Sequence, residues 1–145
     1  MEMVSHSPEE TEEMGLRYAE TLRPGDVVAL EGDLGAGKTA FVRGVLRGLG
    51  YEGRVTSPTF AIANEYETGR AAVVHCDMYR ILDEEALYDM GFEEYLDGRR
   101  ILLIEWSENI RYALPEPRRT VRILYGGGPE ERRLQYDEQG MGAIG

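Results

Sequence analysis

Cysteine and long apolar runs are both scarce in this sequence. Among its 145 residues there is one cysteine, Cys76, so no disulfide can form within the chain. No apolar run approaches the roughly 20 residues that a membrane-spanning helix needs, and the N-terminus lacks the basic and then apolar pattern of a secretion signal. We therefore expect a cytoplasmic protein with no membrane contact, built as one domain over residues 1–145 with a disordered tail at 139–145.

Basic residues are also few. The chain holds 16 of them against 27 acidic residues, which gives a formal net charge of −11. Affinity for a nucleic-acid backbone comes largely from basic side chains, so direct nucleic-acid binding is disfavoured and a protein partner is the better expectation. Arginine pairs at 99–100, 118–119 and 132–133 leave a local basic patch as an alternative, although such pairs are more often solvated surface.

One of the 16 basic residues is a lysine, Lys38, and it stands in a motif. Residues 32–39 read Gly-Asp-Leu-Gly-Ala-Gly-Lys-Thr and fit G-x-x-x-x-G-K-[ST], the phosphate-binding P-loop. An apolar run at 27–30 predicts a strand before the motif, and a helical pattern follows it. In that setting backbone N–H groups and a helix N-terminus face a phosphate. We predict that the nucleotide is bound by Gly35, Ala36, Gly37, Lys38, Thr39 and Ala40, with the Thr39 hydroxyl on Mg²⁺.

The rest of the chain alternates between helical and extended patterns. Ser7, Pro8 and Glu10 predict a capping box at the start of a helix, and Gly50 predicts the end of the helix that follows the P-loop. Further along, we expect an edge strand at 3–5, a hairpin of 60–66 with 71–76, an acidic helix after Asp83, a helical turn at 92–96, a buried strand at 101–104, and a hairpin of 120–125 with 133–136.

Two acids follow apolar strands and are candidates for phosphoryl-transfer chemistry. Glu105 comes directly after 101–104, which is the Walker-B pattern, and Asp77 follows 73–76. Carboxyl ends of parallel strands open onto one crevice, so both acids can face the nucleotide. We assign Glu105 to the metal, directly or through water, and Asp77 to the metal's outer shell or the attacking water. The two roles can be exchanged, and a solvated acid at a helix end is the alternative for each.

Four further features have a functional and a structural interpretation. The hydroxyl-rich turn 56–59 is either a switch segment or a simple loop. His75 can orient Asp77, but a core histidine bonded to a backbone carbonyl is the preferred interpretation. Arg80 can act as an arginine finger, but pairing with Asp83 and Glu84 is preferred. Trp106 taken alone is a packing residue.

Together these motifs resemble one family over almost the whole chain. The P-loop, Ser57-Pro58-Thr59-Phe60, His-Cys-Asp-Met-Tyr-Arg at 75–80 and Ile104-Glu105-Trp106 match, in order and spacing, TsaE (formerly YjeE), the bacterial ATPase of tRNA threonylcarbamoyladenosine biosynthesis. The resemblance implies a small single-domain P-loop NTPase α/β fold, with a mixed, mainly parallel sheet flanked by helices. It also implies slow hydrolysis of Mg-ATP in support of TsaB and TsaD, with tRNA reached only through that complex.

The resemblance also assigns residues. Lys38 and Thr39 take the phosphate and metal roles, Glu105 the metal role, and Asp77 the second strand-end acid. It places Ser57 and Thr59 in the switch, Trp106 beside the site and Thr11 near the adenine. We also include Glu108 in the predicted nucleotide-binding set. The sequence departs from the family at Ala40, where a second threonine is common, and at Ser107, which replaces a proline.

Three other functions share a P-loop. A small-molecule or nucleoside kinase needs a substrate pocket and usually an arginine-rich lid, and no insertion here resembles one. A nucleotide-gated binding module that does not hydrolyse its ligand stays open as an alternative. A GTPase is disfavoured, because its guanine-reading Asn-Lys-x-Asp loop needs a lysine and Lys38 is already used.

Overall fold

The computed structural model describes residues 2–32, 37–55, 63–79, 81–107, 110, 113–114 and 117–136. Several predicted features lie outside these ranges, and their placement stays a prediction: Gly35, Ala36, Ser57, Thr59, Arg80, Glu108 and the tail at 139–145.

The fold is built on a seven-stranded sheet with the order β1-β7-β6-β2-β5-β4-β3. Strands β6, β2, β5 and β4 run parallel, while β7, β1 and β3 each join an antiparallel neighbour. This confirms the expected mixed, mainly parallel α/β sheet. The strands are β1 (Glu2–Ser5), β2 (Val27–Gly32), β3 (Ala63–Glu67), β4 (Ala72–Asp77), β5 (Ile101–Glu105), β6 (Arg119–Tyr125) and β7 (Arg132–Tyr136).

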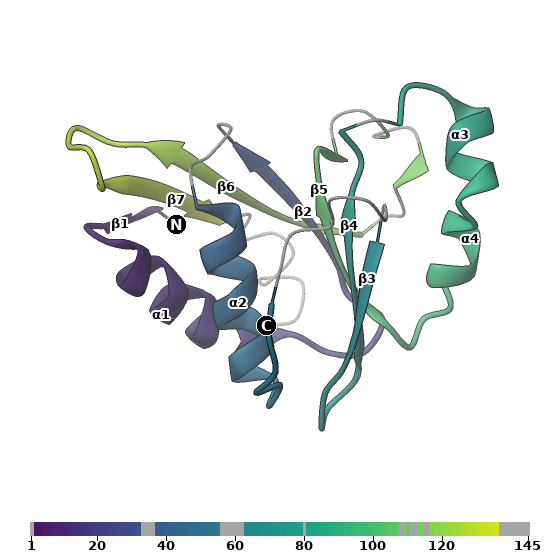
Figure 1. Cartoon of the computed structure of the whole chain (residues 1–145), viewed down its shortest axis with the longest axis horizontal. Helices are drawn as coiled ribbons and strands as arrows, with labels where there is room; N and C mark the ends of the chain where they lie inside the picture. The colour runs from purple at the N-terminus through teal and green to yellow at the C-terminus, as the bar shows by residue number, and fades with distance from the viewer. Residues whose placement is uncertain are drawn as a thin grey trace.

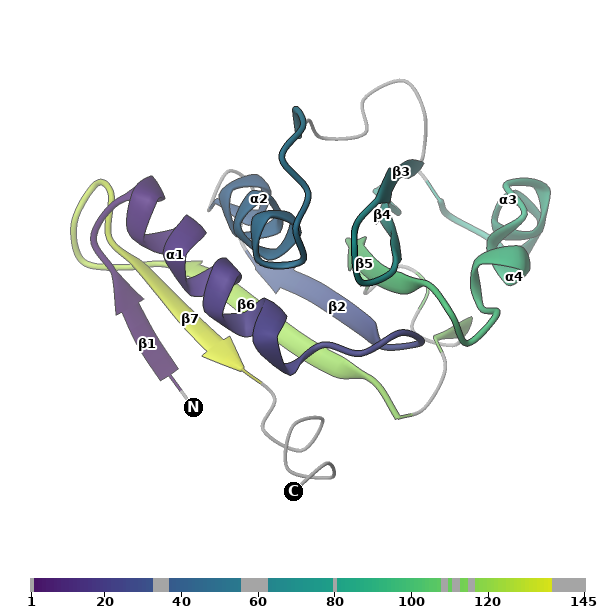
Figure 2. The ribbon, with the colours of Figure 1, turned by 90° about the horizontal axis from the view of Figure 1, so that it is seen from below.

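Helices cover both faces of the sheet (Figures 1 and 2). One face carries α1 (Pro8–Tyr18), which continues into the 3-10 turn η1 (Ala19–Thr21), and α2 (Lys38–Gly48); the short α3 (Glu84–Asp89) and α4 (Phe92–Tyr95) lie beyond the opposite face near β4 and β5. Strand side chains alternate between the faces, so Val28 and Leu30 join the core under α1 and α2, whereas Val27 and Ala29 join the core under α3 and α4. None of the helices in the described ranges is long and apolar enough to cross a bilayer.

The predicted helix ends are largely found in the structure. Ser7 caps α1 by accepting the Glu10 N–H at 3.1 Å, but the Glu10 carboxylate accepts the N–H of His6, one residue before the position that a capping box requires. At the end of α2, Gly50 has φ +98°, its N–H donates to the Arg47 carbonyl, and the N–H of Tyr51 donates to the Leu46 carbonyl. This is a Schellman motif, in which glycine tolerates the left-handed backbone.

The expected hairpins form as β3–β4 and β6–β7, and the expected strand at 101–104 forms as β5, buried along its whole length. The edge strand at the N-terminus forms as β1, and Asp83 caps α3 by accepting the Ala86 N–H. Each of these elements could be predicted because its signal is local: a turn, a cap or a run of apolar side chains.

Glycines let α1 and α2 approach more closely than side chains would allow. A Cβ atom on Gly44 would lie 1.9 Å from the Glu12 carbonyl oxygen, and one on Gly15 would lie 2.3 Å from the Phe41 carbonyl oxygen. Neither atom can move without moving backbone. The close contact also brings α1 to the start of α2, where a Cβ on Gly37 would lie 3.9 Å from Thr11 Cγ2.

We expect Gly44→Ala to destabilise the fold although alanine is the better helix former. The propensity gain is about 1 kcal/mol, whereas forcing a methyl group against backbone costs about 1–3 kcal/mol and separates the helices. Urea denaturation should show a lower midpoint. Gly69→Ala is the matched control, since a Cβ there meets nothing within 4 Å; equal midpoints for both variants would contradict the packing argument.

Candidate functional site

The carboxyl ends of β2, β5 and β4 meet at one edge of the sheet, where α2 begins. Leu30 and Asp77 are both register partners of Glu105, on either side of β5. Asp77 lies on the same face of β4 as Val73, and Glu105 lies on the same face of β5 as Leu103, in the core under α1 and α2. The two strand-end acids therefore occupy adjacent strands on the face from which α2 starts.

Two glycines bracket the phosphate loop, and each has a backbone that other residues rarely adopt. Gly32 has φ +134°, and a Cβ on it would lie 2.0 Å from the Ile123 carbonyl oxygen. Gly37 has φ +103° and precedes the first residue of α2, Lys38. The chain can therefore turn sharply out of β2 and into the N-terminus of α2, with backbone N–H groups at the helix start.

Lys38 is held at the start of α2 by a carbonyl and an aromatic face. It is buried, its Nζ donates to the Gly32 carbonyl at 3.4 Å, and the Nζ lies 4.6 Å from the centroid of the Trp106 ring. A cation over an indole face is favourable by about 0.5–2 kcal/mol. Because these are weak contacts for a buried ammonium, a phosphate can replace them as its partner.

Trp106 connects Lys38 to the surface. It is the non-glycine residue with positive φ, +57°, in the described part of the chain, and its ring packs 5.0 Å from the ring of Tyr79. Such a backbone conformation is costly for a bulky residue and is typical of functional sites. Trp106 also packs on the core under α3 and α4, so the packing interpretation and a place beside Lys38 are both correct.

The carboxylate of Glu105 bonds a histidine rather than solvent. Glu105 is 7% exposed, and its Oε2 lies 2.5 Å from Nε2 of His75, which is fully buried. The preferred expectation, a His75 bonded to a backbone carbonyl, is wrong, and so is the alternative pairing with Asp77. The reason is register: His75 is opposite Leu103, so Glu105 is its diagonal neighbour on the same face and within reach.

Asp77 is held differently. Its Oδ1 accepts the N–H of Tyr79 at 2.9 Å, which closes the turn that ends β4. The N–H of the next residue, Met78, donates to the Glu105 carbonyl at 3.0 Å. Asp77 is partly exposed. The two acids therefore differ: one is buried and bonded to a side chain, the other is accessible and bonded to the backbone.

The remaining predicted residues lie along α1 and α2. Thr11 is buried, with its hydroxyl bonded to Ser5 Oγ at 2.7 Å, so the part of Thr11 that approaches Gly37 is its methyl group. Thr39 and Ala40 are in the first turn of α2, and Ala40 is buried. A contact from Thr11 to an adenine would therefore be apolar.

The oxygen donors near this edge fit Mg²⁺. A hydroxyl from Thr39 and carboxylates from Asp77 and Glu105 are the hard ligands that this ion prefers. Within the described ranges, no group of three His, Cys, Asp or Glu side chains could hold a metal unaided. Mg²⁺ usually keeps several waters and takes nucleotide phosphates as ligands beside one or two carboxylates.

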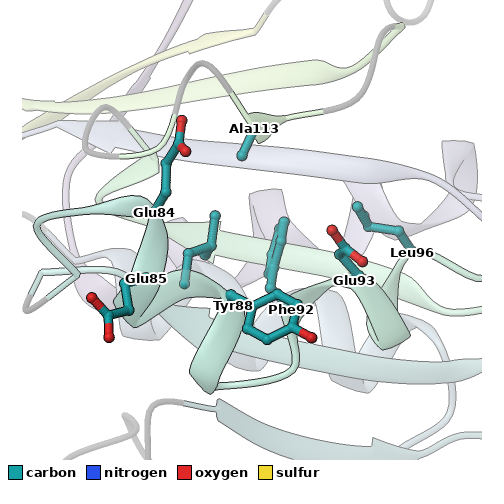
Figure 3. A pocket seen from close by; sticks show the side chains of 8 residues that line it. Glu84, Glu85, Tyr88, Phe92, Glu93, Leu96 and Ala113 are labelled. Atoms are coloured by element: carbon teal, nitrogen blue, oxygen red, sulfur yellow. The ribbon is translucent and has the colours of Figure 1, made fainter.

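A pocket of about 610 Å³ lies elsewhere, between α3, α4 and Ala113 (Figure 3). Leu87, Phe92 and Leu96 line it, together with glutamates from both helices. Its lining includes none of the predicted phosphate- or metal-binding residues.

Cys76 and Arg119 have structural roles. Burial raises the pKa of the Cys76 thiol to about 12, so this side chain is a neutral core residue on the face of β4 opposite His75. Arg119 is buried at the start of β6, where it donates to the Thr21 hydroxyl and carbonyl and lies over the Tyr18 ring. Because it is buried and paired, Arg119 does not contribute to a basic surface patch.

Sequence reasoning missed the His75–Glu105 bond and the tilted ring contact of Tyr79 with Trp106. The spacing His-x-Asp in a strand did place His75 on the face of the acids, but the identity of its partner depends on the pairing of β4 with β5. Ser107 was noted only as a departure from a proline; its hydroxyl is buried and has no hydrogen-bond partner among the described residues.

Two acids end adjacent parallel strands of this mixed sheet, and the helix that begins with Lys38 starts at the same edge. This arrangement defines the class: a small P-loop NTPase-type α/β domain.

Comparisons with known proteins identify the family. The model of "Threonylcarbamoyl adenosine biosynthesis protein TsaE" matches residues 5–134. The TsaE proteins of Bacillus subtilis and Treponema pallidum are 41% and 39% identical, over 92% and 90% of this chain and 83% and 97% of their own lengths. A crystal structure of Bacillus subtilis YdiB superposes with a TM-score of 0.80 at 37% identity, over 94% of this chain and 83% of that one. The chain belongs to the TsaE family.

Proposed function

We propose that this protein is a Mg²⁺-dependent ATPase that supports biosynthesis of the threonylcarbamoyladenosine modification in tRNA. The observation that carries the proposal is the meeting, at one sheet edge, of Lys38 at the start of α2 with the strand-end pair Asp77 and Glu105. The names of its relatives supply the pathway. By family resemblance its partners are TsaD and TsaB, and it contacts tRNA only through them.

The chain's own residues divide the work of phosphoryl transfer, which requires positioning and charge neutralisation. Backbone N–H groups from Gly37 onward and the Lys38 ammonium bind the phosphates, so Lys38 exchanges the Gly32 carbonyl and the Trp106 ring for a full negative charge. Thr39 and Glu105 hold Mg²⁺, which supplies further neutralisation of the phosphate charge. Asp77, the more accessible acid, orients the attacking water.

Replacing Lys38 by alanine should abolish nucleotide binding, because the phosphate site loses the ammonium at the start of α2. In wild-type protein, ATP at about one hundred times its Kd should stabilise the fold by roughly 2.7 kcal/mol, seen as a rise in melting temperature. Arg43→Ala, on the next turn of α2, removes a cation that pairs with Glu12 and should keep that rise. An undiminished shift in the Lys38 variant would refute the assignment.

Replacing Glu105 by alanine should separate binding from hydrolysis. The phosphates keep Lys38 and the α2 N-terminus, so ATP should still bind, while phosphate release should fall by two or more orders of magnitude because an oriented metal ligand is lost. Release is measured with and without the TsaD–TsaB pair, and Glu93→Ala on α4 is the control. If the wild-type protein releases no phosphate and Glu105→Ala leaves tRNA modification intact, the protein is instead a nucleotide-gated binding module that does not hydrolyse its ligand. A phosphorylated nucleoside in place of free phosphate would indicate a kinase.

A further inference from the structure

His75 is a fully buried imidazole whose polar contact is with a predicted metal ligand. Its Nε2 lies 2.5 Å from Glu105 Oε2, and its Nδ1 is buried without a hydrogen-bond partner in the described ranges. A buried polar atom that stays unpaired costs free energy. An apolar residue would fill this position without that cost, so the contact with Glu105 indicates a role for His75 beyond packing.

Hydrogen-bond chemistry selects one state of this pair. A carboxylate only accepts, so the shared proton belongs to Nε2 of His75. A second proton on Nδ1 would leave a buried N–H without an acceptor, and orphaned N–H groups are rarer than orphaned acceptors. The arrangement that fits these contacts has the Nε2–H of His75 donating to Glu105 and Nδ1 without a proton.

We propose that His75 is a positioning residue for Glu105: its Nε2–H fixes the Oε2 oxygen and reserves Oε1 for the metal of a bound nucleotide. The inference rests on the proposed nucleotide-binding function. It also separates the two acids, because Asp77 is held by a backbone N–H and Glu105 by a side chain. Hydrogen-bonded partners of this kind orient metal ligands, and their loss typically weakens metal affinity or activity by about 10- to 100-fold.

Two substitutions test whether the hydrogen bond matters. His75→Leu removes the donor and fills a similar volume, whereas His75→Gln keeps an N–H donor. Trp106, the chain's one tryptophan, lies beside Lys38 and reports nucleotide binding by its fluorescence. ATP is titrated once with Mg²⁺ and once with EDTA. We expect His75→Leu to lose the advantage that Mg²⁺ gives, about 10-fold or more in Kd, with the Kd in EDTA unchanged. His75→Gln should keep most of the advantage.

Val74→Ala is the matched control, because Val74 is equally buried on the same strand but faces the other core. It should lower the melting temperature without changing the Mg²⁺ dependence. A wild-type Mg²⁺ dependence in His75→Leu, or a glutamine variant as weak as the leucine one, would overturn the positioning role and leave the proposed function intact. Absence of any Mg²⁺ advantage in wild-type protein would overturn both.

A measurement on the unmodified protein covers the case in which the leucine variant does not fold. The ¹⁵N spectrum of the histidine side chains should show His75 with Nε2 protonated and Nδ1 bare, assigned by its loss in His75→Gln. The opposite tautomer would place the proton away from Glu105 and overturn the proposal.

Discussion

The register of three parallel strands is the constraint on which the site depends. Pairing of β5 with β4 sets Asp77 beside Glu105, and pairing of β5 with β2 sets Leu30 on the other side of Glu105, two residues before Gly32 turns the chain toward α2. A slip of one residue in β4 would move Asp77 and His75 to the opposite face, among the residues that contact α3 and α4. Such a slip would also break the bond of His75 to Glu105.

The same edge is where the protein accepts buried polar groups. Lys38, His75 and Glu105 are each less than a tenth exposed. Burying charge is costly unless it is paired. The structure pairs Glu105 with His75, whereas among the described residues Lys38 contacts a carbonyl and an indole face, so its positive charge has the most to gain from an incoming phosphate. Burying these groups thus lowers stability at the position where a bound ligand can raise it again.

Local signals made much of the fold and part of the site predictable. Ser7, Gly50 and Asp83 mark helix ends, and glycine-containing turns between extended runs mark the two hairpins. The motif at 32–39 predicts a phosphate site from its residue types and spacing. The features that could not be predicted depend on contacts between residues that lie far apart in the sequence. The bond of His75 to Glu105 requires the register of β4 with β5. The close packing of α1 on α2 depends on Gly15 lying against the backbone of Phe41. The positive φ of Trp106 occurs directly after β5, where its ring contacts Tyr79.

The central claim is that one sheet edge holds a Mg²⁺-nucleotide between α2 and the strand-end acids. A crystal structure with Mg²⁺ and a non-hydrolysable ATP analogue tests this claim most directly. The account predicts phosphates against the N-terminus of α2, Nζ of Lys38 moved from Trp106 onto a phosphate, and Mg²⁺ within reach of Thr39 and Glu105 while Glu105 stays bonded to His75. An analogue bound in the pocket between α3 and α4, or a metal held without Thr39 and Glu105, would contradict it.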